Sequence, residues 1–222
     1  MLQPYIGSKN EDLYLQSFGQ TVDTKVSNVV GLKFALGNEH ITFNAGIIAL
    51  DITLNLPPGF PLPISFAERM GLEISTFGIN IDWNNFLVMS EYLDVKFDHP
   101  DAGDSALSDS DAWYAMIGYR FGKFLPHVTF AELNADNELK LDPTTGMQMI
   151  NFADLGGVSS QTLTIGLRYE LNPSAALKFE WSNVDPQGNT SGLFGPSGSM
   201  GPVPLYDDDD SDVFSIAIDV IF

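Results

Sequence analysis

The C-terminal segment Ser211–Phe222 has the most regular alternation of apolar and polar positions in the chain. One set of alternate positions is polar or small until Ile221, and the other is apolar throughout. The apolar set consists of Phe214, Ile216, Ile218, Val220 and Phe222. A repeat of two residues predicts a β-strand with one apolar face, because successive side chains of a strand point to opposite sides.

The same alternation recurs along the chain and predicts about 11 strands in all. Two interior segments, Ala112–Phe121 and Thr162–Leu171, are especially regular, with apolar residues on one face and Gly, Thr, Arg or Glu on the other. The remaining predicted strands are Leu2–Ile6, Asp12–Gly19, Val26–Leu36, Ile41–Asn55, Arg69–Phe77, Ile81–Phe97, Phe124–Leu133, Ala175–Val184 and Ser211–Phe222. We also expect a bulge near Ile47 and Ile48, where the alternation slips.

The predicted connections alternate between short and long. Tight turns are predicted at 7–10, 37–40, 78–80, 122–123 and 172–173, and longer loops at 20–25, 56–65, 98–110, 134–160 and 185–210. An antiparallel meander with short turns at one end and long loops at the other is typical of outer-membrane barrels. A soluble sandwich mixes hairpins with crossovers instead.

These patterns predict an all-β fold for residues 1–222, a single transmembrane antiparallel up-and-down β-barrel. Its apolar face meets lipid and its polar face lines an aqueous interior. Alternation alone does not say which face is inside, because a soluble up-and-down barrel buries its apolar face. The terminal Phe222 and the two-sided distribution of loops favour the membrane barrel.

Composition excludes a helical membrane protein. Hydrophobic residues make up 44% of the chain and the mean hydropathy is +0.04, with no run that approaches the roughly 20 apolar residues of a spanning helix. Aromatic residues are frequent. Those expected in belts at the membrane interfaces are Trp83, Trp113, Trp181, Tyr92 and Tyr169.

Charge and motifs narrow the function further. The net charge of −19 and pI of about 4.1 exclude a nucleic-acid partner, which requires a basic surface. No cysteine is present. The histidines at 40, 99 and 127 are scattered without metal-ligand spacing, and no catalytic motif occurs, so we expect no enzyme. Met1–Pro4 lacks the features of a signal peptide, so we expect a mature chain or an internal part of a longer one.

Three segments resemble proteobacterial porin-like outer-membrane proteins. Thr164–Asp185 resembles their penultimate hairpin, Trp113–Leu133 an earlier hairpin, and Asp207–Phe222 their C-terminal end. The resemblance implies a water-filled barrel of about 16 strands, commonly a homotrimer, through which small hydrophilic solutes diffuse. It also implies a bacterial outer-membrane location in lipid and lipopolysaccharide, and recognition of Phe222 by the barrel-insertion machinery.

The strand count differs from that family. With about 11 predicted strands, we expect the C-terminal part of a longer porin, truncated at the N-terminus. A self-contained ten-stranded barrel would follow instead if Leu2–Ile6 is not a strand.

Charged residues on polar strand faces are the candidates for lining the pore, where they would set ion selectivity. They are Lys33, Glu73, Arg120, Arg168, Glu170, Lys178 and Glu180. Alternatively these residues are cross-strand ion pairs on a solvated wall, as Arg168 with Glu170 and Lys178 with Glu180 indicate. The two interpretations are compatible.

An acidic run precedes the last strand. A candidate site for Ca²⁺ or Mg²⁺ that bridges to lipopolysaccharide phosphates consists of Asp207, Asp208, Asp209, Asp210 and Asp212. Alternatively the run attracts cations to the pore mouth, or it is simply solvated. No other cofactor is expected. A second acidic set, without the spacing of a calcium loop, consists of Asp98, Asp101, Asp104, Asp109 and Asp111.

The favoured function is therefore that of a porin for passive diffusion of small hydrophilic solutes or ions. One alternative is a non-conducting structural or adhesive barrel that acts through its acidic loops. A second alternative is a soluble secreted β-sandwich that binds a ligand.

Overall fold

The computed structural model describes residues 1–15, 20–55, 69–98, 109–135, 159–187 and 210–221. These residues form ten strands and no helix. The strands are β1 (Leu2–Leu15), β2 (Gln20–Gly37), β3 (Ile41–Asn55), β4 (Met70–Trp83), β5 (Phe86–Asp98), β6 (Ser110–Tyr119), β7 (Phe124–Ala135), β8 (Ser160–Asn172), β9 (Ala175–Pro186) and β10 (Ser211–Val220). Among the described residues there is accordingly no helix of the length and hydropathy that spanning a membrane requires.

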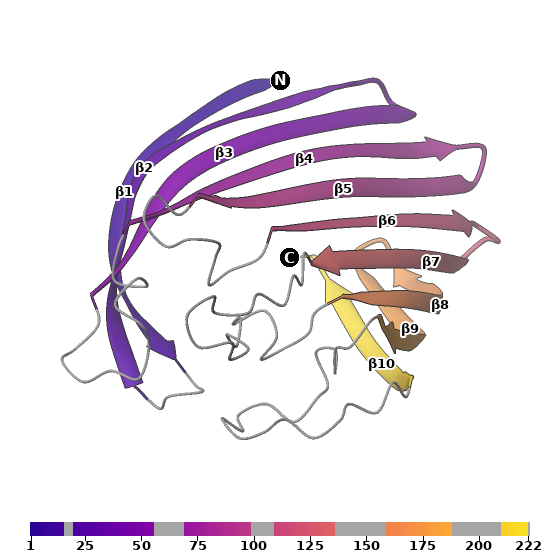
Figure 1. Cartoon of the computed structure of the whole chain (residues 1–222). Coiled ribbons are helices and arrows are strands. Elements are labelled where there is room, and N and C mark those ends of the chain that lie inside the picture. Colours follow the sequence, from indigo (N-terminus) through magenta and orange to yellow (C-terminus); the bar gives the residue numbers. More distant parts are fainter. Residues whose placement is uncertain (16–19, 56–68, 99–108, 136–158, 188–209, 222) are drawn as a thin grey trace.

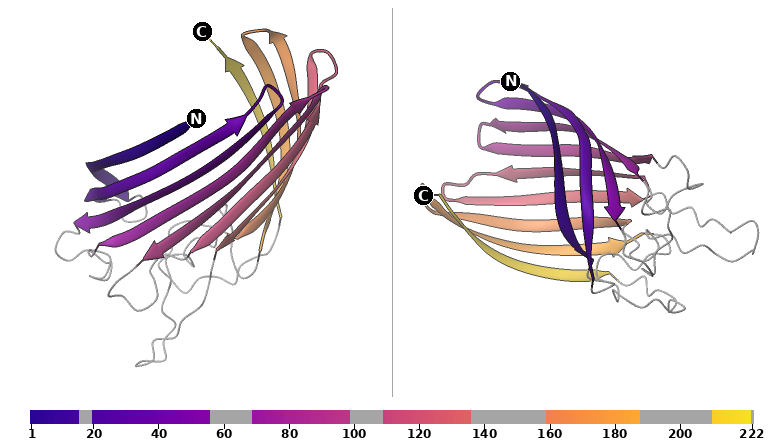
Figure 2. Two further views of the ribbon diagram at one scale, coloured as in Figure 1. Left: turned by 90° about the horizontal axis from the view of Figure 1, so that it is seen from above. Right: turned by 90° about the vertical axis from the view of Figure 1, so that its left-hand side faces the viewer.

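All ten strands belong to one antiparallel sheet in which each strand pairs with the next along the chain. The sheet curls strongly, and the chain proceeds around it in order (Figures 1 and 2). Within the described part of the chain, β1 and β10 each have a partner on one side only, so the sheet is open. The predicted all-β, up-and-down antiparallel arrangement is confirmed, and closure into a barrel stays a prediction.

Connections of two to four residues lie at one end of the strands, and the opposite end has one connection of four residues and four longer ones. The connections at the first end are Asn38–His40, Asn84–Asn85, Arg120–Lys123 and Pro173–Ser174, and this end of the sheet is called the turn edge here. The connections through 16–19, 56–69, 99–109, 136–159 and 187–210 join strands at the opposite end, the loop edge. Both termini lie at the turn edge (Figure 2), because an even number of antiparallel strands returns the chain to its starting side.

Three expectations about local structure are wrong. The predicted strands Leu2–Ile6 and Asp12–Gly19 are one strand as far as Leu15, and the turn predicted between them at 7–10 is a register shift between Gly7 and Lys9. This merger gives ten strands in place of about 11. Residues 20–25, predicted as a loop, belong to β2. The bulge lies between Ser27 and Val30 of β2 and not near Ile47, where β3 pairs continuously.

The turn between β4 and β5 also differs from the expected position at 78–80. Gly78 continues β4 and pairs with Glu91, while Asn84 and Asn85 make the reversal with φ of 48° and 70°. Two consecutive left-handed residues match the twist of the flanking strands, and asparagine tolerates that backbone better than most residues. The apparent turn signal at Gly78 is therefore a glycine inside a strand.

The pairing register divides the side chains between two faces of the sheet. Directly paired residues share a face, and sequence neighbours alternate. The outer face carries an apolar row that contains most of the exposed large apolar residues: Val30, Leu32, Phe34, Phe43, Ile47, Phe77, Tyr92, Ile117, Val128, Leu163, Ile165, Leu167, Phe179, Phe214, Ile216 and Ile218.

The opposite face, called the inner face here, carries the buried residues Val22, Thr24, Met70, His127 and Ala176. Side chains converge on the concave side of a curled sheet and shield one another, so this pattern identifies the inner face as concave. The described residues thus form no apolar core of the kind that a soluble domain buries.

The turn assignment yields a test of local backbone strain. Asn85→Ala should lower the unfolding free energy by about 1 kcal/mol, because alanine pays the left-handed penalty that asparagine partly avoids. Asn85→Gly should equal or exceed the wild type. Denaturant unfolding of the refolded protein measures both, with Asn80→Ala as a control at ordinary strand backbone. Equal stability of the Ala and Gly variants at position 85 would contradict the assigned turn.

Candidate functional site

A group of charged side chains lies on the inner face between the turn edge and the middle of β7–β10. We call it the charged inner wall; its members are His127, Arg168, Glu170, Lys178, Glu180 and Asp219. Register brings them together: Arg168 pairs with Lys178, Gly166 with both His127 and Glu180, and Ala176 with both Glu170 and Asp219.

Arg168 of β8 holds two carboxylates. Its Nε donates to Oε1 of Glu170 at 2.7 Å, and its Nη1 donates to Asp219 of β10. The side chain reaches β10 across the intervening β9, where Ala176 is small and fully buried. One guanidinium therefore links strands that do not pair directly, as its planar fork of donors permits.

Glu180 of β9 accepts from two cationic or titratable groups. Lys178 Nζ lies 2.8 Å from its Oε1, and Nε2 of His127 lies 3.2 Å from the same oxygen. Lys178 is directly opposite Arg168, yet each of these two cations pairs with a carboxylate two positions along its own strand. The like charges are thereby neutralised locally.

Gly166 explains how His127 reaches Glu180. His127 is on β7 and Glu180 on β9, with Gly166 of β8 between them in register. A Cβ built at Gly166 would overlap the His127 ring and approach Glu180 Cγ at 3.1 Å. The imidazole therefore lies across the bare glycine backbone, and any side chain at this position would displace it.

A separate ion pair lies at the turn edge. Nη1 and Nη2 of Arg120 donate to the two carboxylate oxygens of Asp82 at 2.5 and 2.8 Å. This bidentate geometry is the stronger form of the arginine–carboxylate pair. The hydrogen bond to Asp82 raises the pKa of Arg120 further above its usual value, so the guanidinium stays charged.

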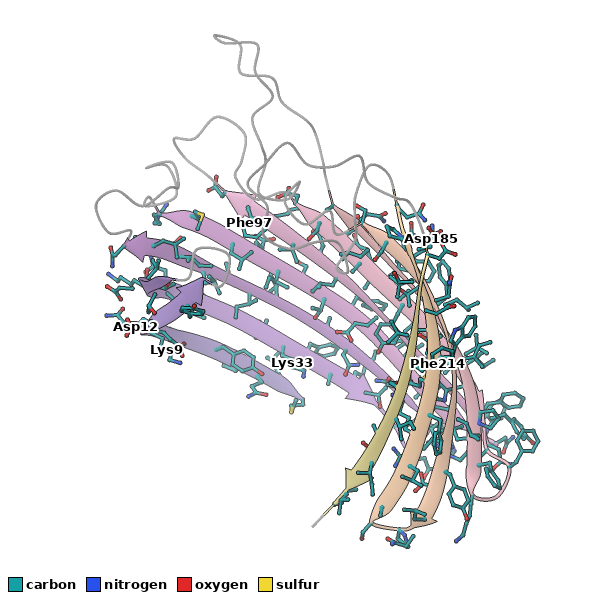
Figure 3. The ribbon with its side chains drawn as sticks, turned by 90° about the horizontal axis from the view of Figure 1, so that it is seen from below. Lys9, Asp12, Lys33, Phe97, Asp185 and Phe214 are labelled. Atoms are coloured by element: carbon teal, nitrogen blue, oxygen red, sulfur yellow. The ribbon has the colours of Figure 1, made fainter. Side chains whose placement is uncertain are left out.

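Most predicted pore-lining residues share the inner face. Arg168, Glu170, Lys178 and Glu180 are brought together; Arg120 lies at the turn edge of the same face, and Lys33 lies on β2. Lys33 makes no hydrogen bond or ion pair with the residues that the structure describes. Figure 3 shows Lys33 well away from the loop edge, near which Phe97 and Asp185 lie.

Glu73 is the exception: the polar face that it was expected to share with the other candidates is not its face, because it lies on the outer side of the sheet. It pairs with Ala49 and Lys96 and shares the outer face with Phe77. The reason is that side chains of β4 alternate without interruption from its loop edge through Gly78. Glu73 therefore lies on the same side as Phe77, although the outer face is polar near the loop edge.

Sequence reasoning missed His127, Asp82 and Asp219 as members of inner-face contacts. In the sequence His127 is one of three histidines without ligand spacing, and no motif marks either aspartate. The usable signal was a glycine between two polar residues in register, as in His127–Gly166–Glu180. This signal can be recognised only when the register of three neighbouring strands is known, and the sequence alone does not give that register.

The two faces exchange polarity toward the loop edge. There the inner face carries an apolar inner half, which comprises Ile48, Leu50, Ile52, Leu72, Ile74, Leu93, Val95, Phe97 and Leu133. The outer face at the same level carries Asp51, Glu73, Asp94, Asp98 and Asp111. Two salt bridges, from Arg69 to Asp51 (3.3 Å) and from Lys96 to Asp94 (3.0 Å), neutralise part of this negative charge.

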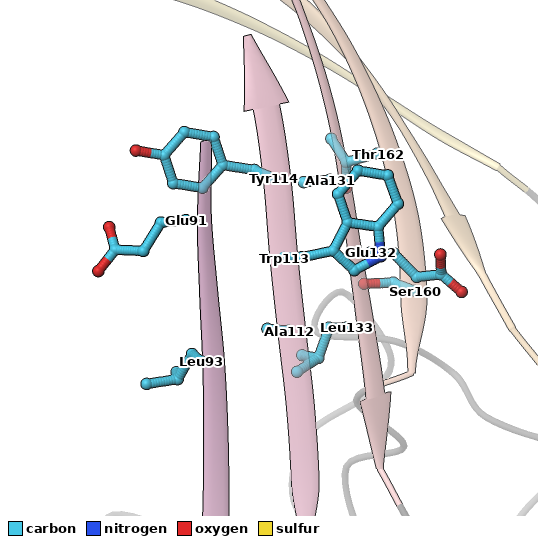
Figure 4. Close-up of a pocket in the computed structure, with 10 residues that line it drawn as sticks. All are labelled: Glu91, Leu93, Ala112, Trp113, Tyr114, Ala131, Glu132, Leu133, Ser160 and Thr162. Carbon is cyan, nitrogen blue, oxygen red and sulfur yellow. The ribbon is translucent and has the colours of Figure 1, made fainter. Parts of the chain in front are cut away.

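A cavity of about 400 Å³ opens where the apolar inner half meets the polar part of the inner face. Figure 4 shows that Glu91, Leu93 and Tyr114 point to one side of the sheet, while Trp113 and Glu132 point to the other. The register places Glu91, Leu93 and Tyr114 on the inner face, so the cavity belongs to the concave side.

The predicted metal site is only partly described. Asp207, Asp208 and Asp209 lie outside the described residues, as do Asp101, Asp104 and His99. Asp212 instead accepts from Trp181 Nε1 at 3.1 Å and Asn183 Nδ2 at 3.3 Å, and Asp109 accepts from the Phe97 amide at 2.8 Å. Asp210 is exposed. The described part of the chain holds no group of three candidate metal ligands, and Ca²⁺ or Mg²⁺ binding by the run stays a prediction.

Comparison with known proteins assigns no family. No protein-family model matches the chain, and no curated protein sequence matches it significantly.

The contact across Gly166 makes a prediction about stability. Gly166→Ala should destabilise the fold by about 1–3 kcal/mol, because the added methyl overlaps the buried imidazole. The same substitution should cost clearly less in a His127→Ala background, since the overlapping ring is absent. Denaturant unfolding of the four proteins gives the coupling energy.

Gly7→Ala is the matched control, because a Cβ at Gly7 meets no atom within 4 Å. Equal costs of Gly166→Ala in both backgrounds would show that His127 does not lie over Gly166.

Proposed function

We propose that this protein is an outer-membrane β-barrel channel through which small hydrophilic solutes and ions diffuse passively. The observation that supports it is the separation of the two faces: an exposed apolar row on the convex side and paired charges on the concave side. In water such an outer face is unfavourable, at roughly 25 cal/mol per Å² of apolar surface. In lipid the same face is solvated.

Aromatic rings near the turn edge fit the interface of such a membrane. Phe86 packs on Tyr119 at 4.8 Å between ring centroids, Tyr119 on Phe121 at 4.5 Å, and Phe124 on Tyr169 at 4.8 Å. The side chains expected in interfacial belts, Trp83, Tyr92, Trp113, Tyr169 and Trp181, all fall on the outer face. Aromatic belts of this kind flank the apolar band of membrane barrels.

The unpaired backbone groups at the free edges of β1 and β10 would need partners in a membrane. Their outward backbone N–H and C=O groups have no strand partner in the described sheet. Hydrocarbon offers no water to satisfy such groups, so only closed sheets cross membranes. In the inserted protein we therefore expect both edges to be paired.

The soluble alternative fits the two faces less well. A soluble β-sandwich packs the apolar faces of two sheets together, whereas the described strands form one sheet whose apolar face is exposed. A non-conducting barrel shares the outer face with a channel. Conductance separates these two functions.

The membrane assignment predicts unequal effects at two adjacent positions. Ile165→Lys places a charge in the middle of the outer apolar row and should cost about 2–4 kcal/mol in lipid. Thr164→Lys, which faces the inside, should cost much less. Urea unfolding in phospholipid vesicles compares them. In a soluble fold the half-exposed Ile165 position should tolerate lysine within about 0.5 kcal/mol, so equal costs would contradict the membrane assignment.

The channel assignment predicts a change in ion selectivity. Arg168 neutralises Glu170 and Asp219, so Arg168→Gln leaves two carboxylates unpaired on the inner wall. Reversal potentials across planar lipid bilayers under a salt gradient should shift toward greater cation preference. Arg69→Gln is the control, because Arg69 pairs with Asp51 of the outer face at the loop edge. An unchanged potential in Arg168→Gln would remove Arg168 from the conducting path, and absent conductance would favour the non-conducting barrel.

A further inference from the structure

The cavity on the inner face combines an apolar floor with one carboxylate. Its described lining includes Leu93 and Leu133 from the apolar inner half, Ala112 between them, and Glu91 and Tyr114 nearer the turn edge. These residues come from β5, β6 and β7, which are consecutive in the sheet. The volume of about 400 Å³ falls within the range of small-molecule sites.

Glu91 differs from the carboxylates of the charged inner wall. Glu170, Glu180 and Asp219 each accept from a cationic side chain. Glu91 is exposed and makes no hydrogen bond or ion pair with any residue in the described ranges. Its direct neighbours in register are Gly78 and Tyr114, and neither carries a positive charge.

An unpaired carboxylate in a partly apolar hollow favours a cation with apolar substituents. The negative charge attracts the cation, and leaving water is less costly for a weakly hydrated alkylammonium group than for a metal ion. The Tyr114 ring beside Glu91 can add a cation–π contact (Figure 4). The net charge of −19 also raises the local concentration of cations.

We propose that this cavity is a binding site for amphipathic organic cations. The ammonium head lies at the Glu91 carboxylate and the Tyr114 ring. A short alkyl body extends toward the loop edge over Leu93, Ala112 and Leu133. Binding needs the folded inner face and not the passage of solutes, so it succeeds or fails independently of the proposed channel.

The test measures equilibrium binding of hexyltrimethylammonium to the protein in lipid nanodiscs, with empty nanodiscs as the blank. Two related probes separate the contribution of the charge from that of the alkyl chain. Tetramethylammonium lacks the alkyl chain, and hexanesulfonate keeps it but reverses the charge. We expect the wild type to bind hexyltrimethylammonium most tightly. Glu91→Gln should weaken this binding at least about tenfold, because the neutral amide preserves shape but removes the charge.

Glu73→Gln is the matched control, since it makes the same chemical change on the outer face, and its affinity should equal that of the wild type. Leu93→Asn provides a second, independent variant that should weaken binding of hexyltrimethylammonium but not of tetramethylammonium. Circular dichroism verifies the β-structure of each variant.

Equal affinity of the wild type and Glu91→Gln would overturn the proposal. So would binding of hexanesulfonate as tight as that of the cation, because that result would mean partition of the alkyl chain into lipid. Absent conductance with intact, Glu91-dependent binding would contradict the channel and leave this site standing.

Discussion

The backbone ladder between consecutive strands is the interaction on which the other features depend. Each of the ten strands pairs with its sequence neighbours, so the register of one pair fixes which residues of the next strand share a face. Since side chains alternate sides, one register assigns a whole row at once. The exposed apolar row, the paired charges and the cavity are three consequences of one continuous set of registers.

Small residues on the concave face make its charge network possible. Side chains crowd together on that side, and large residues at every inner position would not fit. His127 reaches Glu180 across the bare backbone of Gly166, and Arg168 reaches Asp219 beside the small Ala176, which pairs with Asp219. Small residues between long polar ones allow contacts that span three strands. The charge pairing in turn limits the penalty of crowding like charges such as Arg168 and Lys178.

The sequence predicted strands well where alternation was strict and the ends were marked by proline, glycine or asparagine. β8 to β10 differ by few residues from their predicted bounds, and Ile41–Asn55 matches β3 because turn residues mark its two ends although its alternation slips. The prediction of strand ends failed at Gly78, where a glycine inside a strand resembles a turn. Local composition does not distinguish a chain reversal from a close contact between neighbouring strands. Alternation was sufficient to predict the face on which Arg168 and Glu180 lie. Their contact partners could not be predicted, because these depend on the register between several strands. Glu73 was misplaced because polar residues also occupy the outer face near the loop edge.

The exchange of polarity between the faces bears directly on what the inner surface can accommodate. Near the turn edge the inner face offers paired charges that interact with ions, and near the loop edge it offers aliphatic side chains and Phe97. A solute moving from the loop edge along this surface meets the apolar part first. A fully hydrated ion gains nothing there, whereas a molecule with an apolar portion loses unfavourable contact with water. Glu91 lies at the boundary of the two zones without a described partner. The order of the zones thus agrees with the proposed binding of amphipathic organic cations at Glu91, whose apolar part would lie over the loop-edge zone.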